Sequence, residues 1–295
     1  MENLPFCAGA ESAAAQNRNK IKIILRRFIA RLYGARPAKE IFFFVSFAAG
    51  ARHNRRVIGA FLNAFGILLG ALAGLTGRGE LSARTQGQAR SALGAFTAFC
   101  GLQLVWQNVG GGFFHALKQL FLAGLAVVLG NLLGKILGLQ KISNRLGRHA
   151  AGLLAAGPPA AGKKSGGFIA GTILFCAAPL GIVGAVTDGL GGYFFPLALK
   201  AVMDGLATVG FVKIFRWPAA LAAVPVFFFL NDIALAVHAF ALPWLDAHHL
   251  VSAVNAAAGL VIGATALVVL EARRVELANY LPALAVAPLL ARWLG

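Results

Sequence analysis

Long runs of apolar residues, separated by short polar stretches, occupy this chain from Val57 almost to its end. Seven of them are near the roughly 20 residues that an α-helix needs to cross a bilayer. These runs are residues 57–75, 93–109, 117–137, 168–186, 195–215, 218–242 and 250–270. An eighth run, 280–290, is short and contains Pro282 and Pro288, so we expect it to be re-entrant or strongly shortened.

The runs lack the alternation of apolar and polar residues that barrel strands show, and in lipid each backbone amide must then be satisfied within its own helix. The predicted fold is all-α, a polytopic transmembrane helix bundle with seven spanning helices and a short eighth. Gly66, Gly70 and Gly74 fall at i, i+4 and i+8 of the first run. That spacing favours a smooth ridge for close helix packing over a permeation path lined by backbone.

Composition agrees with this class, because 59% of the residues are hydrophobic, only 13% are charged and the mean hydropathy is +0.75. These values exclude an ordinary soluble domain. The formal net charge of +17 need not indicate nucleic acid, since no recognition motif accompanies it. The predicted partner is the lipid bilayer.

Residues 1–56 form a separate basic extension with eleven Lys and Arg, and residues 57–295 form the predicted transmembrane domain. Three interpretations stay open. The stretch 21–32 can form a basic amphipathic helix on anionic lipid, and 41–49 superficially fits the apolar core of an overlong signal peptide. The third interpretation is that the extension is not native and that translation begins near Val57.

Charge between the runs predicts an orientation, because cytoplasmic loops retain Lys and Arg. The first, third, fifth and seventh loops carry thirteen such residues, while the alternate loops carry only Lys118 and Lys200. The odd loops, including the basic segment 135–164, are therefore expected in the cytoplasm. The eleven basic residues of the extension conflict with that assignment.

Two carboxylates, Asp204 and Asp232, lie deep inside the fifth and sixth runs, where an acid needs a partner or water. Lys200 is one helical turn before Asp204. Counted from Trp217 at about 1.5 Å per residue, Asp204, Asp232 and Lys200 lie roughly 20, 22 and 25 Å into the membrane. All three are expected to converge as a site for a solute, cation or proton. A second interpretation is a structural ion pair that fixes helix register and binds nothing. In a third, Lys200 points instead toward the outer interface.

Three further polar residues are candidates for the same site. Asp188 opens an Asp-Gly-Leu-Gly-Gly sequence that predicts a flexible outer loop, either a simple turn or a vestibule that attracts cations. Asn63 and Asn255 occur in similar settings, Leu-Asn-Ala-Phe-Gly and Val-Asn-Ala-Ala-Ala-Gly. This similarity suggests an internal repeat, which in transporters frames a site near the midplane, although helices rich in Gly and Ala resemble one another by chance.

Neither a cofactor nor a metal site is predicted. Cys7, Cys100 and Cys176 have no C-x-x-C spacing and are interpreted as reduced, structural residues. The sequence contains no H-E-x-x-H pair and no nucleotide-binding P-loop, so we expect the protein not to be an enzyme.

From Val57 onward the chain resembles the YqgA/YdfK-like family of bacterial inner-membrane proteins, which carry a domain of unknown function, number 554. The residues behind this resemblance are Gly59 to Ala64, Phe175-Cys176, Thr187-Asp188-Gly189-Leu190, Lys200-x-x-x-Asp204-Gly205, Asn279 to Ala283 and Ala287-Pro288-Leu289-Leu290. Asn231-Asp232 departs from the family pattern. The resemblance implies an integral plasma-membrane protein and no established substrate, and proteins of this kind begin near the equivalent of Val57.

The favoured function is a transporter or channel for a small solute or ion, with Asp204 as the principal site. The alternative is a membrane protein that does not transport but interacts or regulates through the basic segment 135–164. An intramembrane enzyme is the third and least supported reading.

Overall fold

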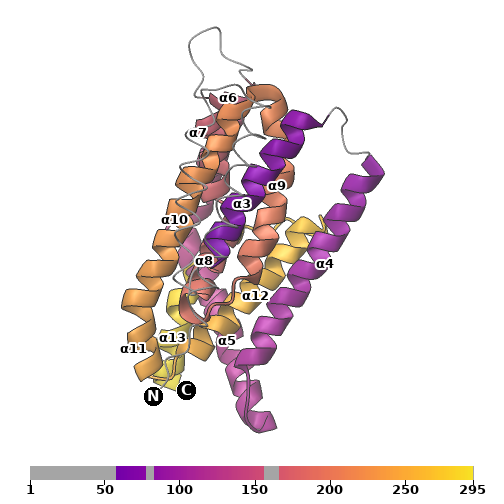
Figure 1. Ribbon diagram of the computed structural model, residues 1–295. Coiled ribbons are helices and arrows are strands. Elements are labelled where there is room, and N and C mark those ends of the chain that lie inside the picture. Colours follow the sequence, from indigo (N-terminus) through magenta and orange to yellow (C-terminus); the bar gives the residue numbers. More distant parts are fainter. Residues whose placement is uncertain (1–57, 78–82, 156–165, 295) are drawn as a thin grey trace, which may run out of the picture. The chain divides into compact units, whose positions relative to one another are not determined.

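A computed structural model describes residues 58–77, 83–155 and 166–294 (Figure 1). The expectations for the basic extension, including Cys7, lie outside these residues. The α-helices of this part of the chain, with the labels of Figure 1, are α3 (Ile58–Thr76), α4 (Ala83–Asn108), α5 (Phe113–Ile136), α6 (Leu139–Ala155), α7 (Gly166–Cys176), α8 (Pro179–Gly191), α9 (Phe195–Phe215), α10 (Ala223–Ala236), α11 (Leu242–Ala247), α12 (Val251–Val269) and α13 (Ala283–Leu294).

The all-α prediction is confirmed. Six helical stretches in the described residues are long and apolar enough to cross a membrane: α3, α5, α9, α12, the stretch Trp217–Ala247 and the stretch Leu277–Leu294. The bent pair of α7 and α8 makes a seventh if it is counted as one span. α4 has 26 residues but is less apolar than these, since Gln and Asn side chains lie among its apolar ones.

Short 3₁₀ turns precede α10 and α13. One is Trp217–Ala222 before α10 and the other is Leu277–Tyr280 before α13, while a π-helical turn, Val237–Ala241, joins α10 to α11. The eighth run was expected to be re-entrant or strongly shortened. It instead belongs to the 18-residue stretch Leu277–Leu294, which is long enough to cross.

Two helix pairs are held by glycine contacts. In the first, α3 packs along α9, and a Cβ added to Gly70 would lie only 2.0 Å from the backbone oxygen of Gly205. A Cβ added to Gly66 would lie 2.4 Å from the Ala201 oxygen, and one added to Gly74 would lie 2.6 Å from the Val209 oxygen, so the predicted packing ridge is confirmed. In the second pair, α12 packs along α4, and Gly101 meets the backbone of Gly259. A buried apolar cluster that includes Leu104, Val183, Leu199 and Ile262 joins the two pairs.

The fourth predicted helix is broken. α7 ends at Cys176 and α8 begins at Pro179, with a bend of 59° between their axes. Pro179 has no N–H, so the carbonyl of Phe175 lacks the donor that a continuous helix would supply four residues later. The break therefore leaves a backbone carbonyl without its helical donor within an otherwise apolar segment.

Helix α6 was missed by the hydropathy pattern, which assigned its residues to a basic loop. Two residues separate it from the end of α5. It carries Lys141, Arg145 and Arg148 on exposed positions. Gln140 fixes its start, because the Gln140 N–H donates to Asn279 Oδ1 (3.0 Å) and Gln140 Oε1 accepts from the Ala278 N–H (3.1 Å).

Candidate functional site

The candidate site is built on one face of α9. Lys200, Asp204 and Thr208 are spaced four residues apart, so their side chains follow each other along the helix. Lys200 and Asp204 form an ion pair within this helix. Asp204 is the tenth residue of α9, which places it roughly 14 Å from the helix start. The pair therefore lies near the middle of a candidate membrane span.

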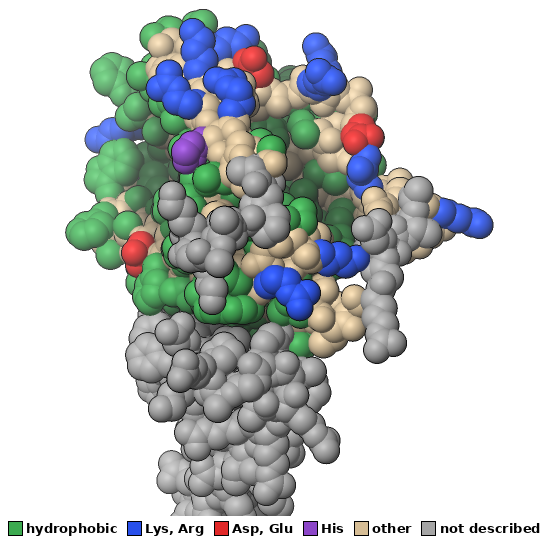
Figure 2. Space-filling view, turned by 90° about the horizontal axis from the view of Figure 1, so that it is seen from above, with side chains coloured by type: hydrophobic (Ala, Val, Ile, Leu, Met, Phe, Trp, Pro, Cys, Tyr) green, Lys and Arg blue, Asp and Glu red, His purple; other side chains and the backbone are tan. Residues whose placement is uncertain are grey.

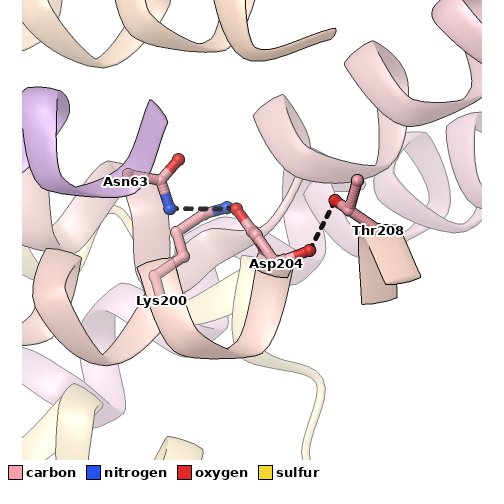
Figure 3. A network of polar contacts seen from close by, with 4 residues as sticks. All are labelled: Asn63, Lys200, Asp204 and Thr208. Atoms are coloured by element: carbon pink, nitrogen blue, oxygen red, sulfur yellow. Dashed lines mark hydrogen bonds and ion pairs between the residues drawn. The ribbon is translucent and has the colours of Figure 1, made fainter. Parts of the chain in front are cut away.

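Asn63 joins this pair from the facing helix α3, as Figure 3 shows. Its Nδ2 donates to Asp204 Oδ2 over 3.0 Å, and the same oxygen accepts the Lys200 ammonium. Thr208 donates its hydroxyl to the Asp204 backbone oxygen (2.7 Å). The side chains of Asn63 and Asp204 can meet between α3 and α9 because the glycines of these helices allow the two backbones to approach closely.

Burial of this network is nearly complete, since Asn63 is 0% exposed, Lys200 is 2% exposed and Asp204 is 7% exposed. An ammonium and a carboxylate removed from water lose a large hydration energy, which their mutual attraction and additional hydrogen bonds must offset. Asn63 supplies one such bond. The three residues thus form a compact, electrically neutral polar group inside the bundle.

The hydrogen bonding of the network is incomplete. Both recorded bonds to the Asp204 carboxylate end on Oδ2, and Oδ1 receives none from the described residues. Asn63 Oδ1 is buried and also has no donor; Figure 3 shows it directed away from the ion pair. A buried acceptor oxygen without a donor, such as Asn63 Oδ1, is rare in folded proteins and calls for an explanation, such as water or a bound solute.

The break between α7 and α8 lies against Lys200. The Lys200 Nζ is 5.7 Å from the centre of the Phe175 ring, at the end of α7. On α8, a Cβ added to Gly181 would lie 2.7 Å from the Cε of Lys200. The lysine chain therefore reaches from α9 to the broken helix, and the ion pair is enclosed by α3, α7, α8 and α9.

Asp188 is placed differently from the prediction. It belongs to the last turn of α8 rather than to a flexible loop, and it is 2% exposed. Its Oδ2 accepts the Gly59 backbone N–H at the start of α3 (2.9 Å). Because the first N–H groups of a helix lack partners in the helix itself, Asp188 acts as a cap supplied from another helix. The geometry gives it a structural contact with α3.

Asp232 does not converge with Lys200 and Asp204, so this part of the prediction is wrong. It is exposed on α10, whereas the other two residues are buried. Counting residues predicts only how far along its helix Asp232 lies, whereas the direction of a side chain around the helix depends on which face packs. α10 packs against α3 and α8 through other residues.

Asn255 belongs to the second helix pair. Its Nδ2 donates to Asn108 Oδ1 on α4 (3.1 Å), and its own Oδ1 is buried without a donor. Asn108 lines a pocket of about 270 Å³ together with His115, Gln119 and Ser252. Asn63 and Asn255 are therefore in two separate polar contacts, not in one site.

Three residues near these contacts were not predicted as site residues: Asn108, Phe175 and Thr208. The four-residue spacing of Lys200, Asp204 and Thr208 was visible in the sequence and could have identified the last of them. The other two act through tertiary contacts that leave no local pattern. No cluster of three or more possible metal ligands occurs among the described residues.

Comparison with known proteins places these features in a family. A family model described as protein of unknown function (DUF554) matches residues 58–292. The chain belongs to the DUF554 family. The resemblance inferred from the sequence motifs is thus confirmed.

Two DUF554 relatives illustrate the extent of the match. The chain is 29% identical over 240 residues to the uncharacterized protein YqgA of Escherichia coli (strain K12), which covers 80% of this chain and 97% of that protein. It is 25% identical over 235 residues to the uncharacterized membrane protein YdfK of Bacillus subtilis (strain 168), which covers 79% of this chain and 94% of that protein. No solved structure matches the chain. This DUF554 protein is a multi-pass membrane protein.

Proposed function

We propose that this DUF554 protein is a non-enzymatic transporter or channel for a small solute or ion, with Asp204, Lys200 and Asn63 as its binding site. The observation that carries the proposal is a buried ion pair beside a broken helix, bonded to an Asn63 side chain whose Oδ1 has no donor among the described residues. Ionisable residues inside membrane spans are costly and usually face a pathway or a partner. Discontinuous helices are a recurrent element of transporter binding sites.

The chemistry of the site favours exchange of the Lys200 ammonium for another cation or a proton at the Asp204 carboxylate. Asp204 is neutralised by Lys200, so a proton or a cation that binds the carboxylate weakens its attraction for the ammonium and favours release of Lys200. Released, the ammonium lies beside the Phe175 ring and the backbone of the break, where the Phe175 carbonyl lacks its helical donor. These alternative partners lower the cost of separating Lys200 from Asp204. Asn63 Oδ1 offers a further acceptor to a solute.

The break supplies a means of movement. Two half-helices joined by two residues can change their angle without breaking any helical hydrogen bonds of their own. Lys200 contacts both halves, through Phe175 on α7 and Gly181 on α8. A change in the partner of Lys200 is therefore coupled to the position of α7 relative to α8.

Flux through reconstituted protein tests the proposal. Full-length protein in liposomes is expected to collapse an imposed proton, Na⁺ or K⁺ gradient, or to take up a solute that raises its thermal stability. Asp204→Asn should lower that flux by roughly tenfold or more, because interactions with a charged group contribute about 1.5 to 3 kcal/mol. Asp232→Asn is the matched control, since it removes an exposed carboxylate outside the network.

Asp204→Asn leaves Lys200 without its carboxylate, so a folding defect must be separated from a transport defect. The double variant Lys200→Met/Asp204→Asn removes both charges and should fold while still failing to transport. Flux at the wild-type rate in either folded variant would remove the mechanism. Equal loss of flux in the Asp232→Asn control would show that the effect is not specific to the network.

A second candidate function, interaction with a partner at the membrane surface, is favoured by α6. This helix presents three exposed cationic residues, and Gln140 holds its start against Asn279. A regulatory partner with an acidic surface would bind such a helix. Lys141→Gln/Arg145→Gln/Arg148→Gln should then abolish crosslinking to that partner without changing flux, and a transport defect in this variant would favour the first function.

A further inference from the structure

A basic pocket of about 450 Å³ lies where α5 and α12 end. Its lining includes Lys135 from α5, Arg273 and Arg274 from the segment after α12, Glu276, and Tyr280 from the turn before α13. It shares no residue with the candidate transport site. Figure 2, which looks onto the end of the described helices where α6 lies, shows Lys and Arg side chains gathered there.

The charges of this pocket are not balanced within the described residues. Lys135, Arg273 and Arg274 are exposed and form no ion pair in that part of the chain. Glu271, two residues before Arg273, is paired with Arg90. Glu276 is the one acid in the lining and its Oε2 accepts from Asn279 Nδ2 (2.8 Å). The pocket therefore carries an excess of positive charge.

The wall of the pocket is fixed by packing. Gly134 contacts the backbone of Asn279, since an added Cβ would lie 2.1 Å from the Asn279 oxygen. Asn279 in turn accepts the Gln140 N–H on Oδ1 and donates to Glu276. These contacts place the turn that carries Tyr280 without any ligand. Asn131, also in the lining, has a buried Oδ1 with no donor.

Apolar side chains continue from the pocket along the outside of the helices. Ile136 on α5 is 74% exposed, and exposed large apolar residues lie nearby in sequence on both helices: Leu132 and Leu133 on α5, Leu267 on α12 and Leu270 directly after it. In a membrane protein such positions contact acyl chains. A molecule with an anionic head and an apolar tail would match both the pocket and this surface.

We propose that the pocket binds the headgroup of an anionic phospholipid, with Lys135, Arg273 and Arg274 holding its phosphate. Arginine presents a planar set of donors that matches phosphate oxygens, and Tyr280 provides a hydroxyl at the same pocket. Basic pockets between membrane helices bind anionic headgroups in this way. The site goes beyond the proposed function and does not depend on it.

Lipid binding to the purified full-length chain tests this site. Fluorescent phosphatidylglycerol is titrated into protein in phosphatidylcholine nanodiscs. At about 1 kcal/mol for each basic residue near a headgroup, Arg273→Gln/Arg274→Gln should weaken binding roughly 30-fold. Lys135→Gln should weaken phosphatidylglycerol binding about fivefold by the same reasoning. It replaces the double variant in the test if the double variant does not fold.

The matched control is Arg145→Gln/Arg148→Gln, which removes the same charge from exposed positions on α6. It should change binding no more than about twofold if the site is local, because neither arginine lines the pocket and salt screens exposed charges. A control that loses affinity as strongly as the pocket variant would overturn the proposal in favour of general electrostatic attraction. Unchanged binding in both pocket variants would overturn it as well.

A separate experiment distinguishes binding of a soluble anion from binding of a lipid headgroup. Inorganic phosphate and glycerol phosphate are added at millimolar concentration, and the thermal stability of the protein in detergent is compared with that in added phosphatidylglycerol. Stabilisation by the lipid alone, lost in Arg273→Gln/Arg274→Gln, supports the proposal. Equal stabilisation by phosphate alone would assign the pocket to a free anion instead of a lipid.

Discussion

The two glycine-mediated helix pairs differ in what they bury. α3 with α9, and α4 with α12, both approach closely through glycine, and in both an asparagine donates across the contact to a polar side chain. In the first pair the acceptor is a carboxylate balanced by Lys200, and in the second it is the amide of Asn108. The same packing arrangement thus holds a charged group in one place and a neutral one in the other.

This difference shows that close helix packing does not by itself make a functional site. A neutral amide pair fixes the register of two helices at a modest desolvation cost, whereas a buried ion pair is expensive to desolvate and often stabilises no more than apolar packing would. Retention of charge is what distinguishes the α3–α9 pair from the α4–α12 pair, since each pair also holds a buried asparagine Oδ1 without a donor among the described residues.

The largest expected effect comes from removing one charge of the first pair. Lys200→Met should lower the free energy of unfolding by about 3 to 5 kcal/mol, because it leaves a buried carboxylate without its counter-charge. The loss should shrink at low pH, where the carboxylate can be protonated. Unfolding by titration with SDS in detergent micelles measures it.

Adding Asp204→Leu to Lys200→Met should recover most of that stability, since no unpaired charge remains. Recovery without flux would separate the function of the pair from its structural contribution. If Lys200→Met were no more destabilising than Asn108→Ala, the contrast between the two helix pairs would be refuted.

Next in size is the effect of filling the glycine contacts. Gly70→Ala and Gly101→Ala should each cost about 1 to 3 kcal/mol, since the added Cβ meets backbone that cannot move aside as a side chain can. The Gly70 variant should be the worse of the two, with its 2.0 Å approach against 2.7 Å for Gly101. The midpoint of thermal unfolding in detergent is the measurement.

Gly124→Ala on α5 is the control for these substitutions, because no heavy atom lies within 4 Å of its added Cβ. It should be neutral or stabilise by up to about 1 kcal/mol through helix propensity. Equal destabilisation at all three positions would mean that close packing is not the cause.

The smallest effect is the difference between the two asparagines. Asn63→Ala removes a hydrogen bond to a charged group, expected to contribute about 1.5 to 3 kcal/mol, and Asn255→Ala removes a neutral one, expected at about 0.5 to 1.5 kcal/mol. SDS unfolding of both variants should rank them in that order. The reverse order would indicate that Asp204 does not depend on Asn63.

Much of the fold followed from the sequence. The bounds expected for the fifth helix, 195–215, agree with α9, and the Gly66, Gly70 and Gly74 ridge packs as its spacing predicts. Within the site, the contact between Lys200 and Asp204 followed from their four-residue spacing on one helix. Local periodicity suffices for such features because both partners lie on the same element.

Other features required the tertiary structure. The partnership of Asn63 with Asp204 spans 141 positions in the sequence. Asp204 and Asp232 lie at similar expected depths, yet one is buried and the other exposed. The hydropathy pattern also missed α6, because the basic residues of this helix resemble those of a loop. The helical periodicity of its apolar residues is the signal that identifies it.

The sequence by itself determined that the chain forms apolar helices, because backbone amides in lipid have no solvent to satisfy them and must pair within each segment. It also determined which segments carry acids and bases. Only the tertiary structure decided which face of each helix turns inward, since rotation about a helix axis is set by packing against neighbours. That rotation separates an enclosed Asp204 from an exposed Asp232, and it is why composition and depth alone did not define the site.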